Sequence, residues 1–186
     1  WHSARQNELR LAEAEFRTRV GKLAELVSMK VSTFELTARG GVSLFAALQW
    51  PSPQHWRNYV AELALDKRVP SATGLGFAAY VDPAGLVNLQ LLLRNTSQGK
   101  YEIRPKGVRP HYGPIVYLQP LTPENLAAIG FDMYSEPVRR QAMRAAMDSG
   151  QPRLSGRVQL VQDTGRDVPG MLMYVPVYQG ALTPST

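Results

Sequence analysis

The strongest constraint in this sequence is an uninterrupted helical pattern at its beginning. No proline occurs before Pro51, and eight apolar residues recur three, four or seven positions apart. This spacing keeps them on one stripe of an α-helix. They are Leu9, Phe16, Val20, Leu23, Val27, Val31, Phe34 and Ala38. The pattern predicts a helix over residues 4–38, with Ser3 as its N-cap.

Such a helix is long for a chain of 186 residues. At about 1.5 Å per residue, it forms a rod of roughly 50 Å. One part of its apolar stripe must therefore cover a globular body. We expect the other part to contact a second copy of the chain, which makes the protein a homodimer through this helix.

Two glycines follow the stripe. Gly40 and Gly41 are expected to stop or kink the helix, because glycine is a poor helix former. A second, shorter helix is then expected over residues 42–49. We interpret residues 1–49 as a helical stalk.

The remainder of the chain mixes short helices and strands. Helices are expected at residues 53–65, directly after Thr122, and at 138–148, where a proline or a capping side chain opens each one. Strand patterns fall at 73–81, 101–105, 113–118, 155–162 and 170–178. The last two indicate a hairpin around the polar turn 163–167.

Two further segments carry weaker signals. Residues 82–85 read as a turn, and the apolar segment 86–93 is left open, with a short helix among its possible structures. A long helix followed by strands and short helices predicts the α+β class. Residues 50–180 are expected to form one globular body, and residues 181–186 resemble a linker.

Composition argues against catalysis. The chain has no cysteine, which excludes disulfides, thiolate zinc sites and cysteine nucleophiles. Its three histidines, His2, His55 and His111, offer little for a metal site or a serine–histidine pair. Neither a Gly-x-Ser-x-Gly elbow nor a phosphate-binding loop occurs. We therefore expect no enzymatic activity, no cofactor and no metal.

The charge of the chain is moderate and dispersed. The formal net charge is +6 and the pI is near 9.8. No three basic residues are consecutive, which argues against a nucleic-acid partner. No stretch approaches the ~20 apolar residues of a membrane span. Since the sequence begins with Trp1 instead of Met, we expect any membrane anchor to lie outside it.

Three segments of the second half occur together in one order. The first is Tyr112-Gly-Pro-Ile-Val-Tyr117. The second runs from Gly130 to Gly150 and contains the patterns G-x-D, P-x-R-R and D-x-G. The third is a hairpin that ends in Pro176-Val-Tyr178. Together they resemble the CHASE domain, the extracytoplasmic sensor module of receptor histidine kinases and nucleotide cyclases.

The resemblance implies a long N-terminal helix followed by a PAS-like subdomain that holds a small-molecule ligand. It also implies a periplasmic or extracytoplasmic location in an inner-membrane receptor of a two-component or cyclic-nucleotide signalling system. The output enzyme would be a histidine kinase, a diguanylate cyclase or a phosphodiesterase. The family's second, membrane-proximal subdomain is expected to be absent from this chain.

The resemblance further indicates a ligand site. Plant cytokinin receptors of the family carry an acidic side chain before the aromatic-small-proline strand, where this chain has Pro110 between Arg109 and His111. Because proline offers no carboxylate to a purine, we expect an anionic ligand instead. The alternative is that both basic residues are solvated loop residues. The expected pocket wall comprises Tyr80, Arg109, His111, Tyr112, Phe131, Met133 and Tyr174.

Neighbouring residues have expected structural roles. In the family, backbone groups at the position of Phe131 contact the ligand. Asp132 is interpreted as a structural carboxylate that binds nearby N–H groups. One of Arg139 and Arg140 is expected to point inward and to pair with Asp132 or Asp148.

A second function remains open at this point. A sensor-fold module without a small-molecule ligand would act in dimerisation or protein contact. A cavity of a few hundred Å³ between the hairpin and the Tyr112 strand favours ligand binding. A fully packed sheet favours the alternative.

Overall fold

The computed structural model describes residues 2–96, 101–161 and 169–179, and its elements are those of an α+β protein. The predicted class is thereby confirmed. The turn expected at 163–167 and the linker expected at 181–186 lie outside the described residues. The helices are α1 (His2–Leu48), α2 (Pro53–Leu63), α3 (Leu65–Arg68), α4 (Pro83–Thr96), α5 (Pro123–Ala128), the 3-10 helix η1 (Met133–Ser135) and α6 (Pro137–Ser149). The strands are β1 (Leu75–Ala78), β2 (Ile115–Gln119), β3 (Arg153–Leu154), β4 (Val158–Gln159), β5 (Pro169–Gly170) and β6 (Met173–Tyr174).

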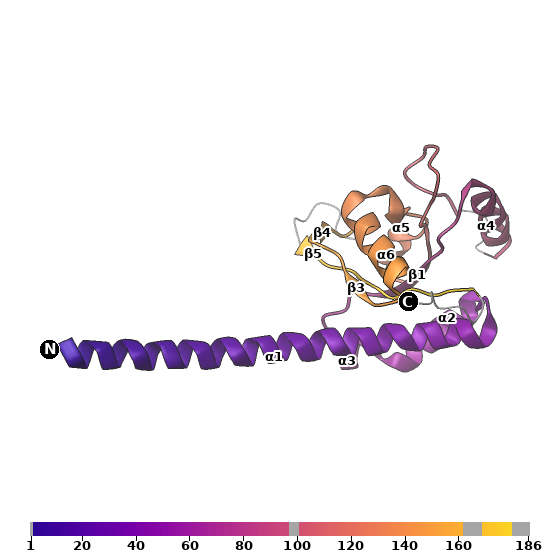
Figure 1. Ribbon diagram of the computed structural model, residues 1–186. Helices are drawn as coiled ribbons and strands as arrows, with labels where there is room; N and C mark the ends of the chain where they lie inside the picture. Colours follow the sequence, from indigo (N-terminus) through magenta and orange to yellow (C-terminus); the bar gives the residue numbers. More distant parts are fainter. Residues whose placement is uncertain (1, 97–100, 162–168, 180–186) are drawn as a thin grey trace.

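Helix α1 is a single rod from His2 to Leu48. The expected break at Gly40 and Gly41 is wrong, and no separate helix begins at residue 42. Figure 1 shows the globular body above the C-terminal part of this rod, while the N-terminal part extends well beyond it. Residues 5–30 are all exposed, whereas Gly41 and Phe45 are buried.

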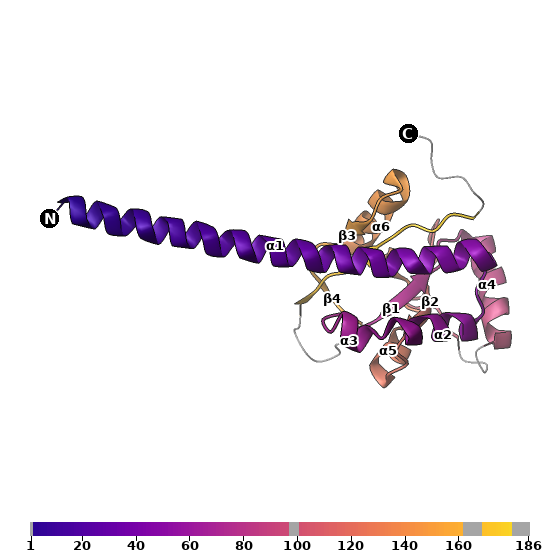
Figure 2. The same ribbon diagram turned by 90° about the horizontal axis from the view of Figure 1, so that it is seen from below.

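The two glycines serve helix packing. A methyl group on Gly41 would lie 3.4 Å from the Trp56 ring, and one on Gly40 would collide with the Tyr59 hydroxyl. That hydroxyl donates a hydrogen bond of 3.0 Å to the Thr37 carbonyl of α1. The absence of side chains thus leaves room for Tyr59 and Trp56 to reach α1 from α2, which runs beside α1 in Figure 2. This packing outweighs the ~1 kcal/mol helix penalty of each glycine.

An aromatic cluster joins α1 and α2 to the sheet. The Phe45 and Phe77 rings are 4.1 Å apart between centroids, and Trp56 stacks on Tyr117 at 5.9 Å. Trp56 and Tyr117 are buried, and the Tyr117 hydroxyl donates to the Pro51 carbonyl at 2.7 Å. The main hydrophobic core therefore lies between the C-terminal part of α1 and the body.

Strands β1 and β2 form an antiparallel pair in which Leu75 faces Gln119 and Phe77 faces Tyr117. A bridge between Val81 and Tyr112 extends the ladder. Two predictions beside this sheet need correction. Residues 101–105 form no strand; only Arg104 forms a bridge, with Phe131.

The second correction concerns residues 82–85, which begin α4 instead of forming a turn. The Asp82 carboxylate accepts the Gly85 N–H at 2.7 Å and so acts as a helix cap. The apolar segment left open at 86–93 therefore belongs to a helix.

The C-terminal half places α6 beside a narrow antiparallel hairpin. Strand β3 pairs with β6, and β4 pairs with β5. This confirms the antiparallel pairing predicted for the two segments, although each described strand is only two residues long. Helix α6 begins with the Glu136 carboxylate on the Val138 and Arg139 N–H groups and ends at Gly150 in the left-handed conformation.

Within the described residues, none of the helices has the length and hydrophobicity required to cross a bilayer. The same residues contain no group of three or more histidine or carboxylate side chains placed to hold a metal ion.

The packing of α2 on α1 generates the first prediction. Gly40→Ala should lower the free energy of unfolding by about 1–3 kcal/mol, because the methyl group displaces Tyr59 from Thr37. Urea denaturation measures the change. Gly21→Ala is the matched control, since a methyl group there meets nothing within 4 Å and should be neutral or stabilising. In a Tyr59→Phe background the Gly40→Ala penalty should shrink. Equal effects of the two glycine substitutions would contradict the packing role.

Candidate functional site

The centre of the C-terminal half is the buried carboxylate of Asp132. Its side chain has 0% exposure. Oδ1 accepts the N–H groups of Gly113 at 2.7 Å and Tyr134 at 3.0 Å. Oδ2 accepts Nε of Arg109 at 3.0 Å, and Nη2 of the same guanidinium lies 2.9 Å away. The structural role expected for Asp132 is thus observed.

Arg109 is held on several sides. Its Nη2 also donates to the Pro105 carbonyl at 2.7 Å, and its guanidinium lies 4.9 Å from the centre of the Tyr112 ring. The Tyr112 hydroxyl accepts the Arg109 N–H at 2.9 Å and donates to the Gly107 carbonyl at 3.1 Å. The charge of Arg109 is therefore already paired with Asp132. Arg109 is not a solvated loop residue, and its guanidinium is not free for a ligand.

Phe131, Met133 and Tyr174 form a second group next to Asp132. The Tyr174 hydroxyl donates to the Met133 sulfur at 3.5 Å. Phe131 and Met133 pack against Ile115, Leu118 and Ala128. Burial raises the pKa of the Tyr174 hydroxyl, and the positive charge of Arg139 partly offsets that effect. The structure thus brings together three of the residues expected at the pocket wall.

Arg139 completes this second group. It is 5% exposed, and its guanidinium lies 5.3 Å from the centre of the Phe131 ring. Nη2 donates to the Gln159 carbonyl at 2.7 Å, and Nη1 lies 3.6 Å from the Glu136 carboxylate. The expected pairing of Arg139 with Asp132 or Asp148 is wrong. Its Nε is buried and has no hydrogen-bond partner within the described part of the chain.

Arg139 is expected to be structural and is not among the residues predicted at the pocket wall. Its helical spacing is the signal that identifies it as the inward-facing member of the arginine pair. Arg139, Ala142, Met143 and Ala146 are the buried residues of α6 and recur three or four positions apart. A charged residue on an otherwise apolar face of a helix points into the interior.

Tyr80 and His111 lie apart from this group. Their rings stack with centroids 5.1 Å apart, and Tyr134 meets Tyr80 edge-on at 5.2 Å. His111 is exposed, and Tyr80 is 44% exposed. The seven expected residues therefore divide into two neighbouring groups of buried or part-buried side chains and one surface pair.

The backbone of Phe131 is also engaged. Its N–H donates to the Ala128 carbonyl at 3.0 Å, and its carbonyl accepts the Ile115 N–H at 3.0 Å. A carbonyl has two lone pairs, so only the carbonyl retains capacity for a further donor. Of the backbone groups of Phe131 expected to contact a ligand, only the carbonyl oxygen can accept a further hydrogen bond.

The family model described as CHASE domain matches residues 51–186, which include the whole body and the C-terminal segment. The chain belongs to the CHASE domain family. A search of curated proteins returned no match. CHASE domains are extracytoplasmic sensor modules of receptors, so the chain has a sensor role in signal transduction.

The family match identifies the part of the chain that belongs to the sensor domain, and it does not identify a ligand. Both buried groups, around Asp132 and around Arg139, lie inside the matched region. The whole of helix α1 precedes it.

The buried ion pair generates a stability prediction. Asp132→Asn should lower the free energy of unfolding by about 3–5 kcal/mol, because it leaves the Arg109 charge without its partner. Glu102→Gln is the control: Glu102 pairs with Lys106 at 3.1 Å, but both side chains are more than half exposed. Its effect should stay below about 1 kcal/mol. Guanidinium unfolding of the two variants provides the comparison, and similar losses would contradict a structural role for Asp132.

Proposed function

We propose that this CHASE domain is the periplasmic sensor of an inner-membrane receptor. It binds a small molecule at the group formed by Phe131, Met133, Tyr174 and Arg139, and passes the signal to a dimeric α1 stalk. The receptor's output enzyme, a histidine kinase, diguanylate cyclase or phosphodiesterase, lies outside the chain.

The observation that carries this proposal is the double contact of strand β2. Ile115 and Leu118 pack in the cluster that includes Phe131 and Met133. Val116 and Tyr117, between them in sequence, pack in the core that includes Phe45 of α1. Phe77 contacts both Phe45 and Tyr117, with ring centroids 4.1 Å and 6.2 Å away. A ligand that displaces the first cluster therefore acts on a strand that is linked to the stalk helix through this shared aromatic core.

Arg139 supports an anionic ligand. The charge of Arg109 is neutralised by Asp132, whereas Arg139 keeps a buried N–H group unused. A buried donor without a partner costs free energy, and a ligand carboxylate or other acceptor would recover it. The ring of Phe131 and the hydroxyl of Tyr174 supply the adjoining surface. Anion recognition thereby moves from Arg109, where the sequence placed it, to Arg139.

A ligand screen tests the proposal. Thermal unfolding of the 186-residue chain is followed with dicarboxylates, amino acids and purines, since a ligand that binds the folded state raises its stability. A carboxylate is expected to be the stabilising class. Arg139→Lys keeps the positive charge but removes Nε, and should weaken that ligand at least tenfold, which corresponds to about 1.4 kcal/mol.

Arg153→Lys, at an exposed position of β3, is the matched control and should bind normally. A purine that binds the wild type and Arg139→Lys equally would contradict the anionic site. Absence of any stabilising compound would instead favour the alternative function, a module that acts by dimerisation or protein contact alone. The internal hydrogen bonds of Arg109 and of the Phe131 backbone are the observations that favour this alternative.

The dimeric stalk is the second part of the proposal. Leu9, Phe16 and Val20 are 63%, 67% and 46% exposed on the projecting part of α1. The same stripe continues to Phe34, which packs against the core of the body. A partner helix would therefore meet α1 on the face that also carries the body. Exposed apolar residues in one stripe are typical of helix–helix contacts.

Substitution of the stripe tests dimerisation. Replacing Leu9, Phe16 and Val20 together by Glu should convert a dimer into a folded monomer, as measured by light scattering and circular dichroism. The matched control replaces three exposed apolar residues on the opposite face of α1, namely Leu11, Met29 and Leu36. The control should remain dimeric. A wild-type chain that is monomeric at millimolar concentration contradicts this part of the proposal.

A further inference from the structure

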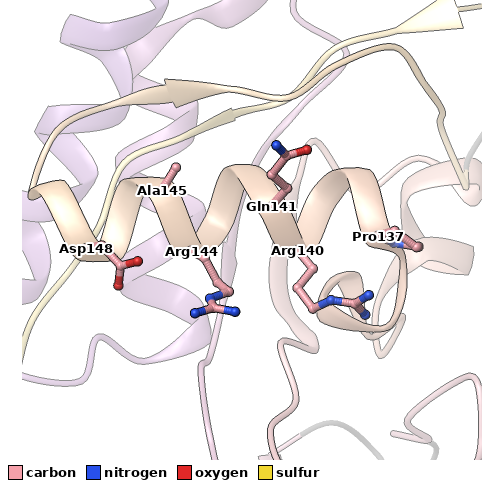
Figure 3. A pocket seen from close by; sticks show the side chains of 6 residues that line it. All are labelled: Pro137, Arg140, Gln141, Arg144, Ala145 and Asp148. Atoms are coloured by element: carbon pink, nitrogen blue, oxygen red, sulfur yellow. The ribbon is translucent and has the colours of Figure 1, made fainter.

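The outward face of α6 carries a surface depression with a volume of about 380 Å³ (Figure 3). Its lining residues are Pro137, Arg140, Gln141, Arg144, Ala145 and Asp148. They recur at intervals of one, three or four positions and so form one stripe along the entire helix. A stripe of this kind is how a helix meets a neighbouring element, yet this one faces outward.

Three charges follow each other along the stripe. Arg140, Arg144 and Asp148 project from the same side of α6 in Figure 3. They are spaced by four residues, about one helical turn or ~6 Å. Arg140 is held by the carbonyls of Tyr134 at 3.0 Å and Ser135 at 3.4 Å. The charges along the row are therefore positive, positive and negative, and the side chain of Arg140 is held in place.

The other two charges are exposed and available. Arg144 and Asp148 form no hydrogen bond or ion pair within residues 2–96, 101–161 and 169–179, although their spacing would allow a mutual pair. Both side chains are exposed. An outside partner would not have to break an existing contact to reach them.

An aromatic surface borders this row. Tyr80 and His111 stack at 5.1 Å, and Tyr134 packs edge-on against Tyr80. Burial and Tyr134 raise the pKa of the Tyr80 hydroxyl, and the charges of Arg144 and Asp148 act on it in opposite directions. Tyr134 also links this surface to the row, because its carbonyl accepts a hydrogen bond from Arg140 at 3.0 Å. Tyrosine and arginine are enriched at the centres of protein interfaces, where they supply most of the binding energy.

We propose that this face of α6 binds a helix of another protein that carries two acidic residues and one basic residue on successive turns. Such a helix places an acidic side chain opposite each arginine and a basic side chain opposite Asp148. The depression is open to the surface instead of enclosed, which suits a helix and encloses a small molecule poorly. None of the described helices of this chain has two acidic residues four positions apart, so a second copy does not supply the complement.

The test uses the 15N-labelled 186-residue chain and synthetic alanine-based helical peptides. One peptide set carries Glu, Glu and Lys at four-residue intervals, and a second set carries Glu, Lys and Lys; each is made in both sequence directions. The first set should give saturable chemical-shift changes confined to α6 and to Tyr80, His111 and Tyr134. The second set should bind at least threefold more weakly.

Arg144→Glu changes the row to positive, negative, negative. It should weaken binding of the first peptide set at least threefold and strengthen binding of the second. A change of net charge alone would shift both affinities in the same directions, so the size of each effect is compared with that of a control. Arg68→Glu on α3 is the matched control, with the same charge change at an exposed position. It should leave both affinities within twofold of wild type.

Three results would overturn the proposal. The first is the absence of saturable binding by either peptide set. The second is an equal effect of Arg68→Glu and Arg144→Glu, which would show that only net charge matters. The third is glutarate binding to α6 as tightly as the peptide, which would assign the face to small anions. Because this face lies outside the Arg139 group, failure of the ligand screen leaves the proposal untouched.

Discussion

The architecture of the C-terminal half depends on burying one carboxylate. The Asp132 carboxylate accepts hydrogen bonds from the main-chain N–H groups of Gly113 and Tyr134 and forms an ion pair with the Arg109 guanidinium. An ionised carboxylate without such donors would be costly in the interior, so these contacts must form together. They fix the entry of strand β2 and the turn before α6 relative to each other. Both the Arg139 group and the outward row of α6 are positioned by that arrangement.

Much of the fold follows from sequence periodicity. The α1 stripe, the caps of α5 and α6 and the antiparallel hairpin were predictable because each signal is local. The glycine pair shows the limit of such reasoning. Gly40 and Gly41 favour a helix end by propensity, but the Tyr59 hydroxyl of another helix occupies the space that a side chain at residue 40 would need. Asp82 likewise favours a turn by residue type, although the same side chain can cap a helix.

The candidate site was predictable only in part. Phe131, Met133 and Tyr174 come together as the family resemblance implied, whereas Arg109, expected at the ligand, takes the pairing with Asp132 that was expected of an inward arginine of α6. Which arginine meets Asp132 depends on the path of the loop before Tyr112, and the sequence pattern does not encode that path. Tyr80 and His111 remain predictions as ligand residues, and their stacking on the surface places them beside α6 instead of the buried group.

Because α1 is one continuous helix, its projecting N-terminal part can act as a lever arm. The body contacts the rod from Phe34 onward, while about 30 residues extend from that point to His2. At about 1.5 Å per residue, the free arm is roughly 45 Å long. A rotation of about 7° where the body holds the helix therefore moves the far end by roughly 5 Å. A shift too small to disturb the aromatic core becomes, at the tip, as large as one turn of a helix.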